Sequence, residues 1–202
     1  MPEMECSEKS PEMIIIAGPN GSGKTTITNQ FLHHEWAEGT LYINPDVIAQ
    51  EIFGDWNSYE SVIKAAKYCE SLREQCLNEG RSFVFETVFS SPDKIDFILR
   101  AKAAGFFIRL FFIGTSSPTI NASRIANRVM EGGHDVSITK IISRYQKSII
   151  NCSFIANIVD RLYVYDNSID NAVATLQYRL SNGVLVKQYV DDIVEWAKRI
   201  LK

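Results

Sequence analysis

One short glycine-rich segment constrains this chain more than any other. Residues 18–25 read Gly-Pro-Asn-Gly-Ser-Gly-Lys-Thr, which fits the pattern G-x-x-x-x-G-K-[ST], and they directly follow the apolar run 13–17. Glycine reaches backbone angles that a Cβ forbids, so successive N–H groups can turn inward around phosphate oxygens. A helix that begins near Lys24 would point the positive end of its dipole at the same phosphates. The segment therefore predicts a P-loop that binds a nucleoside triphosphate.

Two side chains of this loop have expected roles of their own. Lys24 would reach the β- and γ-phosphates, and the Thr25 hydroxyl would be a ligand of Mg²⁺. The expected nucleotide contacts are Gly18, Pro19, Asn20, Gly21, Ser22, Gly23, Lys24, Thr25 and Thr26.

Composition indicates an ordinary soluble globular protein, since 46% of the residues are hydrophobic and 22% are charged. The formal net charge of −3 speaks against a general nucleic-acid-binding protein, which is usually basic. The acidic N-terminal segment lacks the apolar core of a signal peptide, and no apolar run reaches membrane-spanning length. We therefore expect a cytoplasmic protein without a membrane partner. Cys69 and Cys76 have no metal-binding spacing, and we expect buried free thiols.

Apolar strands alternate with helical patterns between residues 13 and 165. The expected strands are 13–17, 40–43, 82–85, 106–113 and 162–165, and the expected helices are 24–32, 47–53, 58–80, 91–104 and two within 117–150. Such alternation predicts an α/β fold, namely the three-layer P-loop NTPase fold, with a mainly parallel sheet and helices on both faces.

The last thirty residues have a different pattern. Asn182-Gly183 separates two apolar runs, which predicts a β-hairpin over 173–189 that extends the sheet antiparallel. Residues 190–201 have the spacing of an amphipathic helix.

Two carboxylates follow predicted strands, at the edge where open α/β sheets place their ligands. Asp46 lies just inside a helix after Asn44-Pro45, and Glu86 ends the strand 82–85. Phosphoryl transfer needs a carboxylate that positions or deprotonates the acceptor hydroxyl, and Asp46 is our candidate. Glu86 would bind the acceptor or order a Mg²⁺-bound water. The alternatives are that Asp46 only complements the helix dipole and that Glu86 only caps the next turn.

A basic, glycine-hinged segment at about 117–150 is the predicted lid. Arg124 and Arg128 lie one turn apart on its first helix, and Arg144 lies on its second. Guanidinium groups suit phosphate oxygens, so we expect at least one of them to neutralise the transferring phosphoryl group. A solvated charged face is the alternative. His134, beside two glycines, is either a hinge residue or, with Arg124, a substrate contact.

Asp166 ends the fifth strand and mimics a Walker B aspartate. Because it follows the lid in the sequence, we expect Asp166 and Asn167 near the adenine rather than at the magnesium ion.

Other classes of P-loop protein need elements that this sequence lacks. A GTPase would show N-K-x-D, and a transporter ATPase would show an L-S-G-G-Q-like signature. A P-loop, strand-end carboxylates and an arginine-bearing lid together indicate a small phosphotransferase. We expect one P-loop kinase domain over 1–202, with a flexible tail at 1–12 and a C-terminal hairpin and helix at 173–202.

These residues resemble the zeta-toxin-like kinases. The P-loop and the segments 44–49, 85–87, 128–136 and 165–168 occur in the order and spacing of that family. The resemblance implies an ATP-dependent kinase, and studied members phosphorylate the amino-sugar 3′-hydroxyl of UDP-N-acetylglucosamine. By position it implies Asp46 as general base, Glu86 and Thr87 at the acceptor, Lys24 and Thr25 at the phosphates and Mg²⁺, and Arg128 and Arg144 as lid arginines.

Three lid positions depart from the family pattern. Met130 stands where relatives often have arginine, Ser137 where proline is usual, and Ser143 in what is commonly an arginine run. Fewer cations weaken the stabilisation of charge in the transition state. Two alternatives stay open: a nucleoside or polynucleotide kinase, and an ATP-binding toxin–antitoxin component without productive turnover. The expected partners are a UDP-sugar or similar small molecule and an antitoxin protein, with nucleic acid not expected.

Overall fold

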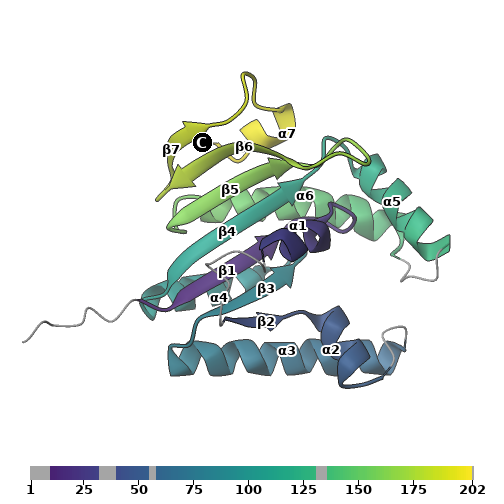
Figure 1. The fold of residues 1–202 in the computed structure, drawn as a ribbon, viewed down its shortest axis with the longest axis vertical. Coiled ribbons are helices and arrows are strands. Elements are labelled where there is room, and N and C mark those ends of the chain that lie inside the picture. The colour runs from purple at the N-terminus through teal and green to yellow at the C-terminus, as the bar shows by residue number, and fades with distance from the viewer. Residues whose placement is uncertain (1–9, 32–39, 55–57, 131–135, 202) are drawn as a thin grey trace, which may run out of the picture.

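The computed structural model describes residues 10–31, 40–54, 58–130 and 136–201. Its strands form one seven-stranded sheet in the order β2-β3-β1-β4-β5-β6-β7 (Figure 1). The strands are β1 (Glu12–Ala17), β2 (Leu41–Ile43), β3 (Phe83–Thr87), β4 (Phe107–Gly114), β5 (Arg161–Asp166), β6 (Thr175–Ser181) and β7 (Val184–Gln188). Strands β1 to β5 pair in parallel, and β6 and β7 add antiparallel.

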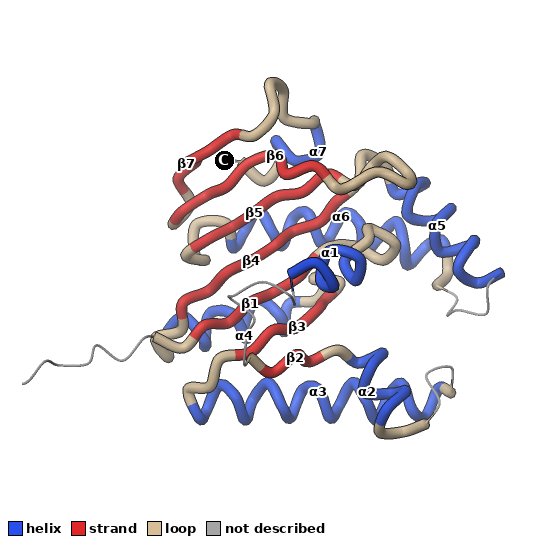
Figure 2. The backbone as a smooth tube through the Cα atoms, in the orientation of Figure 1, coloured by secondary structure: helices blue, strands red, loops and turns tan. Residues whose placement is uncertain are grey.

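The helices in the described ranges are α1 (Lys24–Phe31), α2 (Pro45–Glu51), α3 (Tyr59–Glu79), α4 (Pro92–Ala103), α5 (Pro118–Met130), α6 (Ile138–Ile155) and α7 (Glu195–Lys198). Among them, α1 to α6 connect these strands and α7 follows the last one. The α/β fold with a mainly parallel sheet, predicted from the alternation of elements, is confirmed. In Figure 2 the loops after β1, β3, β4 and β5 gather at one edge of the sheet, where a P-loop must lie.

Alternation along the strands sorts the core onto two faces. Met13, Ile15 and Ala17 of β1 point to one face, and they share a buried cluster with residues of α3, α4, α6 and α7. Ile14 and Ile16 point to the other face, where α1 covers them. A strand buried on both faces has to be apolar at every position, which explains the unbroken run at 13–17.

The ends of α3 follow from its capping residues. The Ser58 hydroxyl accepts a hydrogen bond from the Ser61 amide at 3.4 Å, and Gly80 ends the helix with a φ of 62°. The hairpin prediction is also confirmed. Asn182 and Gly183 both have positive φ, 47° and 79°, which is the backbone that a two-residue type I′ turn requires.

The predicted helix over 190–201 is wrong for most of its length, because α7 spans only Glu195–Lys198. Instead, side chains of the hairpin form hydrogen bonds with the backbone of residues 190–194, which precede α7 in the sequence. Gln188 Nε2 donates to the carbonyls of Val190 and Asp191, and the Val194 amide donates to Gln177 Oε1. The apolar spacing reflected packing against the sheet rather than a continuous helix.

Several smaller expectations can be compared with the structure. Glu12, predicted in the tail, opens β1. Cys69, Cys76 and Cys152 are buried free thiols, as expected for the first two. Within the described ranges, the chain has no helix with both the length and the apolar character needed to cross a bilayer.

Candidate active site

The loop 18–23 joins β1 to the first turn of α1 and curls tightly against neighbouring loops. Gly18 has a φ of 151°, and a Cβ there would stand 2.0 Å from the Ile113 carbonyl oxygen. Gly23 has a φ of 91°, and a Cβ there would meet Asn167 Nδ2 at 2.3 Å. The Gly18 amide donates to the Thr87 carbonyl at 3.3 Å, which ties the loop to β3. Both glycines are therefore required by the close approach of these segments.

Lys24 lies across this loop, with its Nζ donating to the carbonyls of Gly18 at 3.0 Å and Pro19 at 3.1 Å. Burial of the amine lowers the pKa of Lys24 to about 8, and the nearby Arg128 guanidinium acts in the same direction. The carboxylates of Glu86 and Asp46 oppose this shift. The amine therefore lies within electrostatic reach of both predicted acids and of one predicted lid arginine.

Glu86 is the centre of a cluster of hydroxyl donors at the end of β3. Its Oε1 accepts hydrogen bonds from the Thr28 hydroxyl at 2.7 Å and the Tyr42 hydroxyl at 2.6 Å. Its Oε2 accepts from the Thr25 hydroxyl at 3.3 Å. Strand pairing places Glu86 beside Ile16 of β1, next to the P-loop. The structure thus brings together Thr25, the predicted ligand of Mg²⁺, and Glu86, the second predicted carboxylate.

Asp46 lies in the first turn of α2, as predicted. Asn44 caps this helix, because its Oδ1 accepts from the Asp46 amide at 2.9 Å. Asn44 Nδ2 donates to the Tyr42 hydroxyl at 2.6 Å, so the cap is linked to the Glu86 cluster. The Asp46 side chain is exposed to solvent, and its charge acts on Lys24. Asp46 is therefore accessible from solvent and lies within electrostatic reach of the buried Lys24 amine.

The predicted lid arginines lie close to the P-loop. Arg124 forms a salt bridge with Asp170 at 2.7 Å and donates to the Gly21 carbonyl at 3.5 Å. Arg144 donates to Asn20 Oδ1 at 3.3 Å, and Arg128 influences Lys24 as described above. The structure therefore brings all three arginines to the P-loop.

A cleft of about 620 Å³ opens between α1, α5 and the loop after β5. Gly23, Thr26, Arg124, Arg128, Asn167 and Asp170 are among its lining residues. Its volume falls in the usual range for small-ligand sites.

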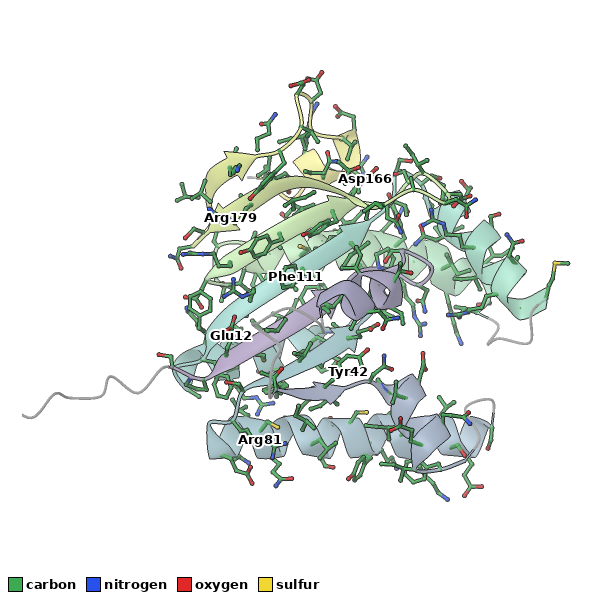
Figure 3. The ribbon with its side chains drawn as sticks, viewed as in Figure 1. Glu12, Tyr42, Arg81, Phe111, Asp166 and Arg179 are labelled. Carbon is green, nitrogen blue, oxygen red and sulfur yellow. The ribbon has the colours of Figure 1, made fainter. Side chains whose placement is uncertain are left out.

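Asp166 and Asn167 have different surroundings. Asn167 lines the cleft, and its Nδ2 donates to the Ser22 carbonyl at 2.8 Å. The Asp166 carboxylate accepts from the Ser168 hydroxyl at 2.6 Å and from Trp196 Nε1 at 2.7 Å. Asp166, labelled in Figure 3, therefore fixes the loop beside the cleft through its side chain.

The structure adds less about Thr87, His134 and the three positions that depart from the family pattern. The Thr87 hydroxyl accepts from the Phe89 amide at 3.2 Å, and His134 lies outside the described residues. Of the three departures from the family pattern, Met130 is 87% exposed, Ser137 makes no capping hydrogen bond through its side chain, and Ser143 is half-buried.

Sequence reasoning missed the residues that support Glu86. Thr28 follows Thr25 by one helical turn, a spacing that could have indicated a second hydroxyl on the same face. Tyr42 lies next to Ile43 at the end of β2, and nothing in its neighbours signals a contact with Glu86, 44 positions away.

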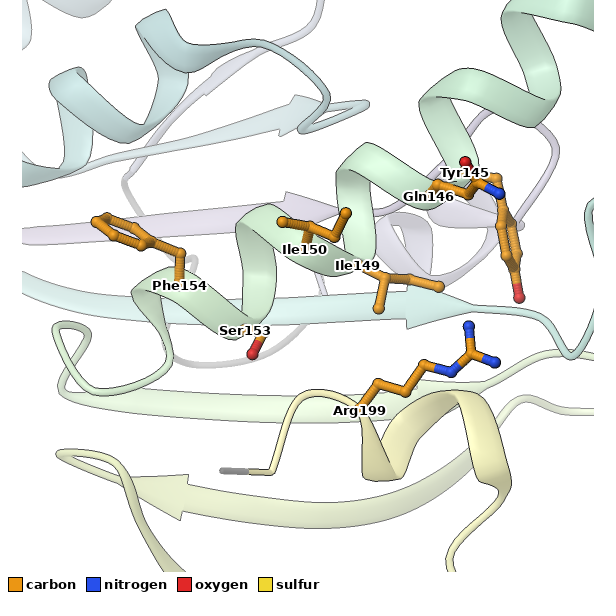
Figure 4. Close-up of a pocket in the computed structure, with 7 residues that line it drawn as sticks. All are labelled: Tyr145, Gln146, Ile149, Ile150, Ser153, Phe154 and Arg199. Carbon is orange, nitrogen blue, oxygen red and sulfur yellow. The ribbon is translucent and has the colours of Figure 1, made fainter.

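A second hollow, of about 470 Å³, lies between α6 and α7 (Figure 4). Its walls include Tyr145, Ile149, Ile150, Phe154 and Arg199. None of the predicted site residues lines it. The candidate active site is therefore the cleft beside the P-loop together with Lys24, Asp46 and Glu86, which lie close to one another.

A family model described as zeta toxin matches residues 3–175. The chain belongs to the zeta toxin family. The matched stretch contains the P-loop, Asp46, Glu86, the lid arginines and Asp166.

Individual proteins are also similar to this chain. An uncharacterized protein of Haemophilus influenzae is 30% identical over 132 residues, which cover 65% of this chain and 91% of that protein. The PezAT toxin–antitoxin system of Streptococcus pneumoniae contains a chain with a TM-score of 0.60 and 21% identity, covering 96% of this chain and 84% of that one. A chain of the AvrRxo1-ORF1:-ORF2 complex with ATP has a TM-score of 0.62 and 19% identity. The match covers 95% of this chain but only 62% of that one. The two solved structures show that this zeta toxin relative shares their fold.

Proposed function

We propose that this zeta toxin family member is an ATP- and Mg²⁺-dependent kinase that phosphorylates a hydroxyl of a small molecule, with a UDP-N-acetyl sugar as the leading acceptor. One observation carries the proposal: Asp46, Glu86 and Arg128 all act electrostatically on the P-loop amine of Lys24. A phosphate-binding cation close to two carboxylates and an arginine suits phosphoryl transfer. Family membership supports the acceptor class.

The residues around Thr25 fit a magnesium ion. Mg²⁺ prefers hard oxygen ligands and is usually held by one or two carboxylates together with substrate phosphates. Thr25 Oγ1 lies 3.3 Å from Glu86 Oε2, so a hydroxyl and a carboxylate are available side by side. When bound, the ion would neutralise charge on the β- and γ-phosphates.

In the proposed reaction, the Asp46 carboxylate takes the proton of the acceptor hydroxyl. The acceptor oxygen then forms a bond to the γ-phosphorus, and the bond from that phosphorus to the β–γ bridging oxygen breaks, which releases ADP. Lys24, Arg128 and Arg144 stabilise the charge on the transferring group. The proposed acceptor contacts are Glu86, Thr87, Arg124 and His134, and Asn167 is a proposed contact of the nucleotide.

A protein partner is also proposed. PezAT is a toxin–antitoxin system and AvrRxo1-ORF1 is bound to AvrRxo1-ORF2. By analogy, an antitoxin that binds this chain and blocks its activity is the expected partner.

Mass spectrometry of UDP-N-acetylglucosamine incubated with the protein and ATP tests the acceptor, since the product should be heavier by one phosphate. Asp46→Asn should abolish transfer while ATP still binds. Asp93→Asn is the matched control, because Asp93 also follows a proline in the first turn of a helix and has no proposed role. Phosphate transfer only to an oligonucleotide 5′-hydroxyl would contradict the proposal and indicate a polynucleotide kinase. ATP binding without transfer to any metabolite of a cell extract would contradict it in favour of a nucleotide-binding component without turnover. Wild-type turnover by the Asp46→Asn variant would remove Asp46 from the mechanism.

A further inference from the structure

Both predicted lid helices bind the same P-loop residue, Asn20. The Asn20 carbonyl accepts a hydrogen bond from Asn121 Nδ2 of α5 at 2.6 Å. Its side-chain oxygen accepts from Arg144 of α6 at 3.3 Å. The backbone of Asn121 also packs on the P-loop, because a Cβ on Gly21 would stand 2.6 Å from the Asn121 carbonyl oxygen. Asn121 therefore fixes the loop through both its backbone and its side chain.

Asn121 is itself held in place inside the protein. Its side chain is fully buried, and its Oδ1 accepts a hydrogen bond from the Thr115 hydroxyl. The Thr115 carbonyl accepts from the Tyr145 hydroxyl of α6 at 2.6 Å. A buried amide with both ends bonded has one orientation, so the Nδ2 donor is aimed at Asn20 before any ligand arrives.

Helix α6 also holds the loop after β3. Asn151 Nδ2 donates to the Phe89 carbonyl at 3.0 Å, and the Ser148 hydroxyl bonds to the Val88 carbonyl. Phe89 is buried and has a φ of 61°, a left-handed conformation that is strained for a bulky side chain. Such a conformation persists only where the surroundings hold it. Asn151 supplies one of these restraints, and Phe89 itself lies three residues after the predicted acceptor residue Glu86.

We infer that Asn121 and Asn151 are positioning residues with separate duties. Asn121 sets the P-loop for the nucleotide, and Asn151 sets the loop 87–90 for the acceptor. The second duty rests on the proposed function, because it takes Glu86 and Thr87 as acceptor contacts. Neither residue contacts a reacting atom in this assignment.

Two matched substitutions test the inference. In Asn121→Ala, hydrogen–deuterium exchange should rise in residues 18–23 and stay unchanged in 86–91, and the affinity for ATP with Mg²⁺ should fall about tenfold, as loss of one buried hydrogen bond predicts. In Asn151→Ala, exchange should rise in 86–91 only, ATP affinity should stay unchanged, and the KM for UDP-N-acetylglucosamine should rise. Calorimetry gives the ATP affinities, and peptide mass spectrometry gives the exchange.

The outcomes separate this inference from the proposed function. If wild-type protein binds ATP but phosphorylates no acceptor, the proposed function fails, while the two exchange patterns and the ATP affinities still judge the positioning duties. Equal loosening of both loops in both variants, or of neither loop, would overturn the inference. Asn121→Leu keeps a branched side chain with the same number of heavy atoms while removing the donor, and it should reproduce the Asn121→Ala pattern. If neither Asn121 variant folds, Asn121 serves the stability of the fold and the inference is overturned.

Discussion

The Tyr42 hydroxyl lies 2.6 Å from Glu86 Oε1, so a phenol on β2 fixes the carboxylate at the end of β3. Burial is the main reason that the pKa of Tyr42 is raised above its usual range, and the negative charge of Glu86 adds to it. The phenol therefore stays protonated at neutral pH and acts as a donor. Tyr42, labelled in Figure 3, is thus a support for the proposed metal and acceptor site.

Tyr42→Phe should reduce both stability and turnover. The change removes one donor from Glu86 and leaves Asn44 Nδ2 without the acceptor that it has at 2.6 Å. We expect the free energy of unfolding to fall by about 1–2 kcal/mol and phosphate transfer to slow about tenfold. Denaturant unfolding and initial rates measure the two effects. Tyr68→Phe, on an exposed face of α3, is the control and should change neither; equal losses in the two variants would argue against a special role for Tyr42.

ATP binding should be accompanied by proton uptake at alkaline pH. Since the pKa of Lys24 is lowered to about 8, about half of the amines are neutral at pH 8, and nearby phosphates favour the protonated form. ATP affinity should therefore fall as pH rises through 8, and about half a proton should be taken up per ATP at pH 8. Calorimetry in two buffers of different ionisation enthalpy measures the uptake.

Two lysine variants control the proton experiment. Lys24→Arg should bind without the uptake, because a guanidinium does not titrate in this range. Lys64→Met, which changes an exposed lysine of α3, should leave the uptake unchanged. Undiminished uptake by the Lys24→Arg variant would assign the proton to another group.

Gly18→Ala should destabilise the protein far more than Gly80→Ala. Both glycines have positive φ, but a Cβ on Gly18 would stand 2.0 Å from a backbone carbonyl, whereas a Cβ on Gly80 would meet nothing within 4 Å. We expect losses of about 3 kcal/mol at Gly18 from overpacking and about 1 kcal/mol at Gly80 from backbone strain alone. Thermal and denaturant unfolding compare the pair, and similar losses would mean that the P-loop can move away from Ile113.

The three described cysteines should resist thiol reagents while the protein is folded. Burial raises the pKa of Cys69 to about 11 and also raises the pKa values of Cys76 and Cys152, which disfavours the reactive thiolate. Labelling at pH 8 followed by peptide mass spectrometry should show modification of these three residues only after denaturation. Rapid native labelling of Cys69 would show that α3 opens locally from the core.

Much of the fold was predictable because its signals are local. The apolar run of β1, the serine and glycine that bound α3, and the Asn182-Gly183 turn each determine nearby backbone geometry. The segment after β7 was not predictable in this way. Its apolar spacing suits a helix, but Gln177 and Gln188 of the hairpin form hydrogen bonds with its backbone groups. Tertiary hydrogen bonds there override a local preference.

The residues of the candidate site also fall into two groups, those in local motifs and those with distant partners. Lys24, Thr25 and Asp46 belong to short motifs whose chemistry can be read from neighbouring residues. Thr28, Tyr42 and Asn121 act through partners that are distant in the sequence, up to 101 positions away for the bond from Asn121 to Asn20. Register and strand order bring such residues together, and a single sequence states neither.

The indole of Trp196 donates to Asp166 and lies against Gly114, where a Cβ would approach its ring to 2.4 Å. This tryptophan lies beyond residue 175, where the match to the family ends. The loop after β5 is thus braced by a part of the chain that lies outside the family match. Substitutions at Trp196 would therefore alter the shape of the cleft without changing any residue of the family motifs. A change in the length of the C-terminal segment would have the same effect.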